Sequence, residues 1–153
     1  MAQNPITPAT KNITARPQPG SLPTTLVRSF LIDNVHTDLL LQLFSDQILI
    51  IVTQLSGRPG TILRCTVEDS PMDEKKMFHV DALLGKRDDS LLEVYVRRIT
   101  ERIVQLSEDR MCPPIVLGMA LKGDSGKEPA SFTKIVDTVL NIYGEGIGVA
   151  SSL

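Results

Sequence analysis

QILIIVTQL, at residues 47–55, is the segment of this chain with the strongest preference for a β-strand. Its centre, residues 48–52, contains only Ile, Leu and Val, so an extended strand here is apolar on both faces. The following GRPG, at residues 57–60, combines two glycines with a proline and predicts a tight turn. We therefore expect a sheet in which this segment is a buried strand.

Further strands are predicted on both sides of this segment from β-branched or alternating runs that are separated by turn residues. The pair Asp33-Asn34 joins two of them into a hairpin, and Ser45-Asp46 leads into the central segment. Such tight turns favour antiparallel pairing. The five further strands are expected at residues 26–32, 38–44, 61–67, 77–84 and 115–121.

Two helices are predicted where the apolar period changes from that of a strand to that of a helix. The first begins near Ser90, which would form a capping box with Glu93. The second spans residues 130–143 and is expected to end at Gly144. The order of five strands, a helix, a strand and a helix predicts an α+β fold. We expect a six-stranded antiparallel sheet with two helices packed on one face, and we expect it to dimerise.

The chain has 153 residues, which suits one domain. Residues 1–25 contain half of the ten prolines together with many Thr, Asn and Gln residues, so this tail is expected to be disordered. Residues 26–145 are expected to form the single α+β domain. The small residues at 146–153 are expected to fray.

Composition and charge exclude several classes of function. Sixteen basic against eighteen acidic residues give a net charge of −2, which disfavours nucleic-acid binding. No apolar stretch is long enough for a transmembrane helix, so no membrane contact is expected. The two cysteines lie far apart in the sequence, and no cofactor or metal site is predicted. The absence of a signal peptide predicts a cytoplasmic protein, with the nucleus as a second compartment.

Two of the predicted strands are apolar on both faces, which indicates a partner. In one, Leu39 points to one face while Leu40 and Phe44 point to the other. Leu49 and Ile51 continue the second set in the central segment. Because two helices cover only one face, the other face needs a second cover. We expect dimerisation through Leu40, Phe44, Leu49 and Ile51. The alternative is that strong sheet curvature, or the first strand folding over, hides these side chains.

No motif in the chain predicts an enzyme. GDSG, at residues 123–126, resembles the nucleophile motif of chymotrypsin-like proteases, but Lys127 stands where that motif has another glycine. A polar turn is the better interpretation. His79 and Asp81 share a strand face, yet no nucleophile accompanies them. A small hydrolase using Cys112 or His79 remains an alternative that substitution by alanine would test.

Several of these segments together resemble one family, proteasome assembly chaperone 3. The similarity lies in QILIIVTQL and its GTIL continuation at residues 60–63, in LLG with the acidic Asp88-Asp89, in LLEVY, and in IVLGMALK. It covers about residues 26–143, most of the predicted domain. The long N-terminal tail and the polar loop at 68–76 differ from the shorter animal members.

The resemblance implies a non-catalytic chaperone that promotes assembly of the α-subunit ring of the 20S proteasome. It implies pairing with a related chaperone, proteasome assembly chaperone 4, and release before maturation. Apart from the resemblance, the apolar second face of the sheet leaves a homodimer as the other expectation. From charge and expected exposure, we predict that Asp73, Glu74, Arg97 and Arg98 contact an α-subunit. The alternative class is a dimeric roadblock- or longin-like scaffold subunit of a GTPase or trafficking complex.

Overall fold

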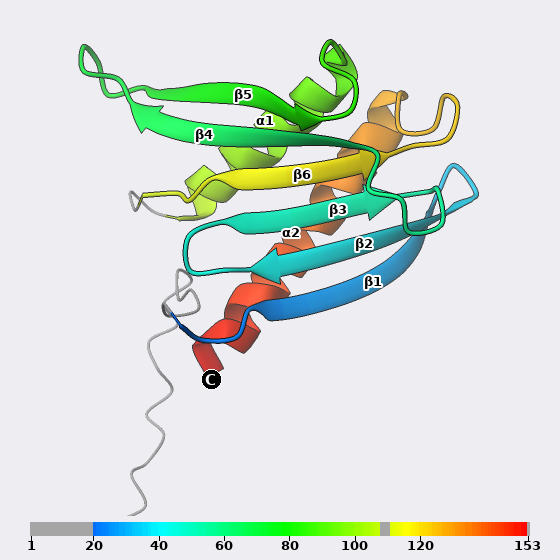
Figure 1. Cartoon of the computed structure of the whole chain (residues 1–153), viewed down its shortest axis with the longest axis horizontal. Helices are drawn as coiled ribbons and strands as arrows, with labels where there is room; N and C mark the ends of the chain where they lie inside the picture. The colour runs from blue at the N-terminus through cyan, green and yellow to red at the C-terminus, as the bar shows by residue number, and fades with distance from the viewer. Residues whose placement is uncertain (1–19, 108–110, 153) are drawn as a thin grey trace, which may run out of the picture.

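The computed structural model describes residues 20–107 and 111–152. The predicted order of five strands, a helix, a strand and a helix is confirmed (Figure 1). The elements are β1 (Thr24–Ile32), β2 (Val35–Leu43), β3 (Ile48–Thr53), β4 (Thr61–Asp69), β5 (Lys76–Leu84), α1 (Ser90–Leu106), β6 (Ile115–Ala120) and α2 (Pro129–Ser152).

The six strands form one mixed sheet in the order β1-β2-β3-β6-β4-β5. Four of the five neighbouring pairs are antiparallel, but β3 and β6 run parallel, from Ile48 opposite Ile115 to Thr53 opposite Ala120. The prediction of a purely antiparallel sheet is therefore wrong. A parallel pair needs a long crossover connection. Here β4, β5 and α1 supply it, because the chain returns through α1 and inserts β6 between β3 and β4.

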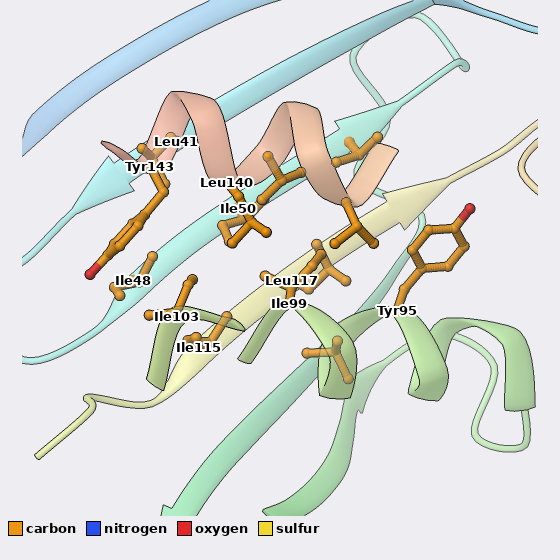
Figure 2. Packing of buried hydrophobic residues seen from close by; sticks show 14 of the residues in the cluster. Leu41, Ile48, Ile50, Tyr95, Ile99, Ile103, Ile115, Leu117, Leu140 and Tyr143 are labelled. Atoms are coloured by element: carbon orange, nitrogen blue, oxygen red, sulfur yellow. The ribbon is translucent and has the colours of Figure 1, made fainter. Parts of the chain in front are cut away.

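The core lies between the sheet and the two helices, which pack on one face as predicted (Figures 1 and 2). Figure 2 shows side chains of α1 and α2 pointing at the central strands. Alternate residues of β2, β3 and β6 meet them, and each of these side chains is at most 2% exposed: Leu39, Leu41, Leu43, Ile48, Ile50, Val52, Ile115, Leu117 and Met119. Each buried Leu or Ile stabilises the fold by about 1.5–3 kcal/mol before entropy is subtracted.

Helix α1 presents the predicted apolar stripe to this core, with Tyr95, Ile99 and Ile103 fully buried. Its N-cap is Asp89, whose Oδ1 accepts a hydrogen bond from the Leu92 backbone N–H at 3.3 Å. The capping box predicted for Ser90 is therefore wrong by one residue. Aspartate is an equally good N-cap and places its negative charge at the positive end of the helix dipole.

Residues 146–152, part of the segment predicted to fray, belong to helix α2, whereas Leu153 lies outside the described residues. The predicted helix end at Gly144 is wrong, because α2 continues to Ser152. The reason is packing against β2. A Cβ added to Gly146 would lie 2.9 Å from Leu41 Cδ2 and 3.2 Å from Leu43 Cδ1, so glycine lets the helix approach the sheet closely. Ile147, in the next position, is 4% exposed. Burial of this last part of the helix outweighs the low helix propensity of glycine.

The sheet begins at Thr24, which pairs with Leu43 and is buried. The predicted domain boundary at residue 26 is therefore two residues late. Of the predicted disordered tail, residues 1–19 lie outside the described part of the chain. Within the described ranges, neither helix combines the length and apolar character needed to cross a bilayer.

Candidate functional site

The candidate site is the sheet face that points away from α1 and α2, called here the open face. Figure 1 views the sheet with both helices behind it, and no described helix lies over the front. Strand register aligns an apolar row across this face. The row runs from β1 to β4 through Val27, Leu40, Ile51, Gly118 and Ile62.

Three of the four predicted interface residues meet on the open face. Leu40 pairs directly with Ile51. Leu49, two residues before Ile51 in β3, points to the same face. All three are half-buried, whereas their neighbours Leu39 and Ile50 on the helix side are at most 1% exposed. Phe44 lies just beyond the end of β2 and is also half-buried. A row of apolar side chains with water on one side favours a protein partner.

The first strand does not fold over the open face, because β1 is an edge strand paired with β2. It leaves Val27 and Leu31 more than half exposed. The loop between β3 and β4 covers part of β6 instead. A Cβ added to Gly118 would lie 3.2 Å from the Pro59 carbonyl oxygen, so this loop needs glycine beneath it. Among the described residues, this loop therefore covers the row at Gly118, between Ile51 and Ile62.

Charged pairs border the apolar row on its β4–β5 side. Arg64 lies 3.6 Å from Asp81, and His79 lies 3.4 Å from Glu68, both across the two strands. His79 and Asp81 thus share the predicted face, but each contacts a β4 side chain. The geometry is that of cross-strand ion pairs on a sheet surface.

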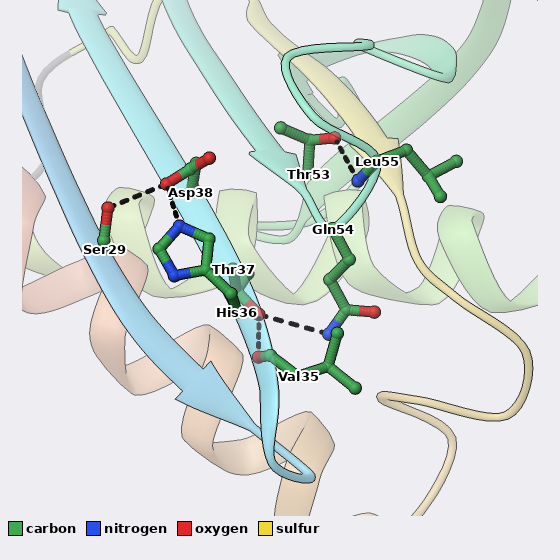
Figure 3. Close-up of polar contacts among 8 residues, drawn as sticks. All are labelled: Ser29, Val35, His36, Thr37, Asp38, Thr53, Gln54 and Leu55. Atoms are coloured by element: carbon green, nitrogen blue, oxygen red, sulfur yellow. Dashed lines mark hydrogen bonds and ion pairs between the residues drawn. The ribbon is translucent and has the colours of Figure 1, made fainter.

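On the β1–β2 side, a smaller polar group borders the row (Figure 3). The Ser29 hydroxyl donates to Asp38 Oδ1 at 2.7 Å, and His36 Nε2 lies 2.8 Å from the same oxygen. The Ser29 hydrogen bond, and next the bond and charge of His36, hold the pKa of Asp38 below its ordinary value. The open face therefore combines an apolar centre with polar borders, the usual composition of a protein interface.

A buried hydrogen-bond network holds the end of the sheet where β3 and β6 both stop. Gln54, 4% exposed, donates to Thr37 Oγ1 at 3.1 Å and to Ser125 Oγ at 2.8 Å (Figure 3 shows the first). Its Oε1 accepts from the Lys122 backbone N–H at 2.8 Å. Ser125 of the GDSG segment thus serves a structural network. Sequence alone could not connect Gln54 with residues so distant in the chain.

Asp33, in the β1–β2 turn, ties this network to the start of α2. Its carboxylate accepts hydrogen bonds from the Ser131 hydroxyl at 2.5 Å and from the Gly126 backbone N–H at 3.1 Å. The Ser131 bond, then the Gly126 bond, hold the pKa of Asp33 below its ordinary value of 3.8. A carboxylate with a depressed pKa stabilises the folded state at neutral pH.

Replacing Asp33 by asparagine is therefore expected to weaken the dependence of stability on acid. In the wild-type chain, the contribution of Asp33 is present above pH 3.8 and is lost as the pH falls through its lower, folded-state pKa. Thermal unfolding should be measured from neutral to acidic pH. Asp33→Asn should have a lower Tm than wild type at neutral pH, and its Tm should decrease less as the pH falls. The exposed Asp46, replaced by asparagine, is the control. Parallel curves for Asp33→Asn and wild type would contradict the assignment.

The predicted α-subunit contacts lie on two separate elements. Asp73 and Glu74 are exposed in the β4–β5 loop, whereas Arg97 and Arg98 are exposed on α1. Among the described residues, no ion pair or hydrogen bond joins the two sets. Glu101 forms ion pairs with both arginines, with N–O distances of 3.1 Å to Arg97 and 3.7 Å to Arg98. Arg97 also lies over the Phe78 ring, 5.8 Å from its centroid.

The cysteines and acidic groups offer no catalytic or metal centre in the ranges 20–107 and 111–152. Cys65 is buried, and this burial raises the pKa of its thiol. Cys112 is half-buried, and its Sγ lies 3.4 Å from the Pro113 carbonyl oxygen. No three His, Cys, Asp or Glu side chains of these ranges are grouped to hold a metal ion.

Comparison with known proteins identifies a family for this chain and a solved structure that shares its fold. The family model described as Proteasome assembly chaperone 3 matches residues 50–142. A Nematostella vectensis protein of the same description is 32% identical over 115 residues, which cover 69% of this chain and 81% of that protein. A chain in the crystal structure of a chaperone complex for yeast 20S proteasome assembly shares the fold. Its TM-score is 0.61 at 14% identity, over 80% of this chain and 99% of that one. The chain therefore belongs to the proteasome assembly chaperone 3 family, as its resemblance implied.

Proposed function

We propose that this chain is a non-catalytic chaperone of 20S proteasome assembly that acts on the α-subunit ring. Membership of a chaperone family, over a match that runs from β3 into α2, supports the chaperone role. A chain of a yeast assembly-chaperone complex shares this fold, which supports a role within a protein complex. The open face is the observation that carries the proposal, because its apolar row is suited to another protein.

The partner on the open face is proposed to be a related chaperone, proteasome assembly chaperone 4, with a second copy of this chain as the other possibility. Leu40, Leu49 and Ile51 would pack against the partner sheet, and Phe44 would extend the contact beyond β2. Sheets that pack face to face bury alternate side chains in this way. The charged pairs at the border would set the partner's orientation and would limit affinity, which suits a chaperone that is released before maturation.

The cytoplasm, with the nucleus as a second compartment, is the proposed place of action. Cys65 and Cys112 are not joined in a disulfide, the state that a reducing compartment maintains. A fluorescent fusion examined in living cells tests this proposal. Accumulation in the secretory pathway would contradict it.

Gentle purification of a C-terminally tagged chain, followed by mass spectrometry, tests the function. We expect α-subunits and a second small chaperone to co-purify while mature β-subunits are depleted. GTPases or vesicle-complex subunits in the absence of proteasome subunits would overturn the proposal and favour the roadblock- or longin-like class. The variant Ile51→Asp serves as a control for the open face, because it should lose the second chaperone selectively.

A further inference from the structure

The outer surface of α1 carries an excess of positive charge in a chain whose net charge is negative. The helix contains three arginines and two glutamates. Arg97 forms an ion pair with Glu101 and lies over the Phe78 ring. Arg98 reaches Glu101 only at 3.7 Å, and the described part of the chain gives Arg102 no ion pair. Because Arg98 and Arg102 are four residues apart, they lie on the same side of the helix.

These two arginines line a groove between α1 and α2. The groove has a volume of about 250 Å³, and Phe132, Thr133, Val136 and Asp137 complete its lining. The Phe132 ring packs against Tyr95, with their centroids 4.4 Å apart. Tyr95 is itself fixed by a hydrogen bond from its hydroxyl to the Gly126 carbonyl at 2.5 Å. The apolar part of the groove is therefore held in place by the core.

The size and lining of the groove indicate its occupant. Pockets for cofactors or drug-sized ligands usually have volumes of roughly 300–1,000 Å³, so this groove suits a single large side chain. The half-buried Phe132 ring favours an apolar or aromatic group. Guanidinium groups bind carboxylates in a bidentate geometry. Asp137, on the α2 side, repels a second acid and so directs the carboxylate towards Arg98 and Arg102.

We propose that this groove docks an acidic segment of an α-ring subunit. One aromatic or leucine side chain of the segment enters between α1 and α2, and a neighbouring carboxylate binds Arg98 and Arg102. The identity of the partner rests on the proposed function. The residues that line the groove belong to α1 and α2. Both helices lie behind the sheet in Figure 1, on the opposite side from the open face. A partner chaperone and an α-subunit can therefore be bound at the same time.

A small probe tests the groove without any proteasome subunit. Titration of the full-length, ¹⁵N-labelled chain with 3-phenylpropionate should shift the backbone amides of Phe132, Thr133 and Val136. 3-Phenyl-1-propanol, which lacks the carboxylate, should bind at least tenfold more weakly. The double variant R98Q/R102Q should also bind 3-phenylpropionate at least tenfold more weakly. The control R58Q/R87Q, with the same change in charge at exposed sites, should match wild type. Shifts that map elsewhere, or undiminished binding by R98Q/R102Q, would overturn the proposal.

Capture of proteasome subunits tests the partner. Tagged R98Q/R102Q should recover at least tenfold less α-subunit than R58Q/R87Q, while it retains the second chaperone. Equal recovery of α-subunits by the two variants would overturn the groove as their docking site and leave the proposed function standing. If the wild-type chain recovers no α-subunit, the proposed function is overturned, and with it the identity of the partner.

Discussion

Replacing Ile51 by aspartate is expected to leave the monomer folded and to abolish the pairing proposed for the open face. Ile51 lies at the centre of the apolar row on the open face and is only half-buried in the single chain. A carboxylate there stays hydrated in the monomer, but a partner sheet would bury it without a counter-charge, which is strongly unfavourable. Light scattering after size exclusion, together with circular dichroism, measures both effects.

The neighbouring residue provides a matched control. Ile50 is the same residue type, points to the helix side and is 0% exposed. Ile50→Ala should lower the free energy of unfolding by about 2–5 kcal/mol, because it removes buried methyl groups and leaves a cavity. The folded fraction of Ile50→Ala should still bind the proposed partner. A well-folded Ile51→Asp chain that pairs as well as wild type would exclude the open face as the interface.

The second large effect is expected at Gly146, where α2 crosses β2. A leucine here must displace Leu41 and Leu43, since even a Cβ would lie 2.9 Å from the first of them. Overpacking of this kind typically lowers the free energy of unfolding by about 1–3 kcal/mol. Urea unfolding of Gly146→Leu should show a clearly lower midpoint.

Gly144, two residues earlier on the same helix, is the control for Gly146. It is exposed, and a Cβ added to it meets nothing within 4 Å. Gly144→Ala should therefore stabilise the chain by about 1 kcal/mol, the difference in helix propensity between the two residues. If Gly146→Leu proved as stable as Gly144→Ala, the close packing of α2 on β2 would be wrong.

Local patterns in the sequence predicted the elements well but did not predict how distant strands pair. Alternation and period identified all six strands and both helices, because each pattern reflects burial on one face of one element. The parallel β3–β6 pair was missed, since tight turns say nothing about where a strand after a crossover helix will insert. The end of α2 was missed because Gly144 resembles a terminating residue, while the packing that extends the helix comes from β2.

Local sequence patterns also predicted only some residues of the candidate surfaces. Leu40, Leu49 and Ile51 were found because strict alternation assigns a strand residue to one face. Arg102 was not among the predicted α-subunit contacts, because all three arginines of α1 lie on its polar side and helical period alone does not show which of them borders α2. The Gln54 network brings together β2, the β3–β4 loop and the β6–α2 loop, which are far apart in sequence. No local pattern can indicate such a contact.

The position of β6 has a consequence for how the chain folds. The β1–β2–β3 meander and the β4–β5 hairpin can each form from neighbouring residues, but only β6 joins them. During synthesis, both units must wait until residue 120 has left the ribosome, with the backbone edges of β3 and β4 unpaired. Long-range pairing of this kind slows folding, and open strand edges attract other chains. We expect insertion of β6 to be the rate-limiting step. A chaperone of assembly would then itself be most prone to aggregate just before its own sheet closes.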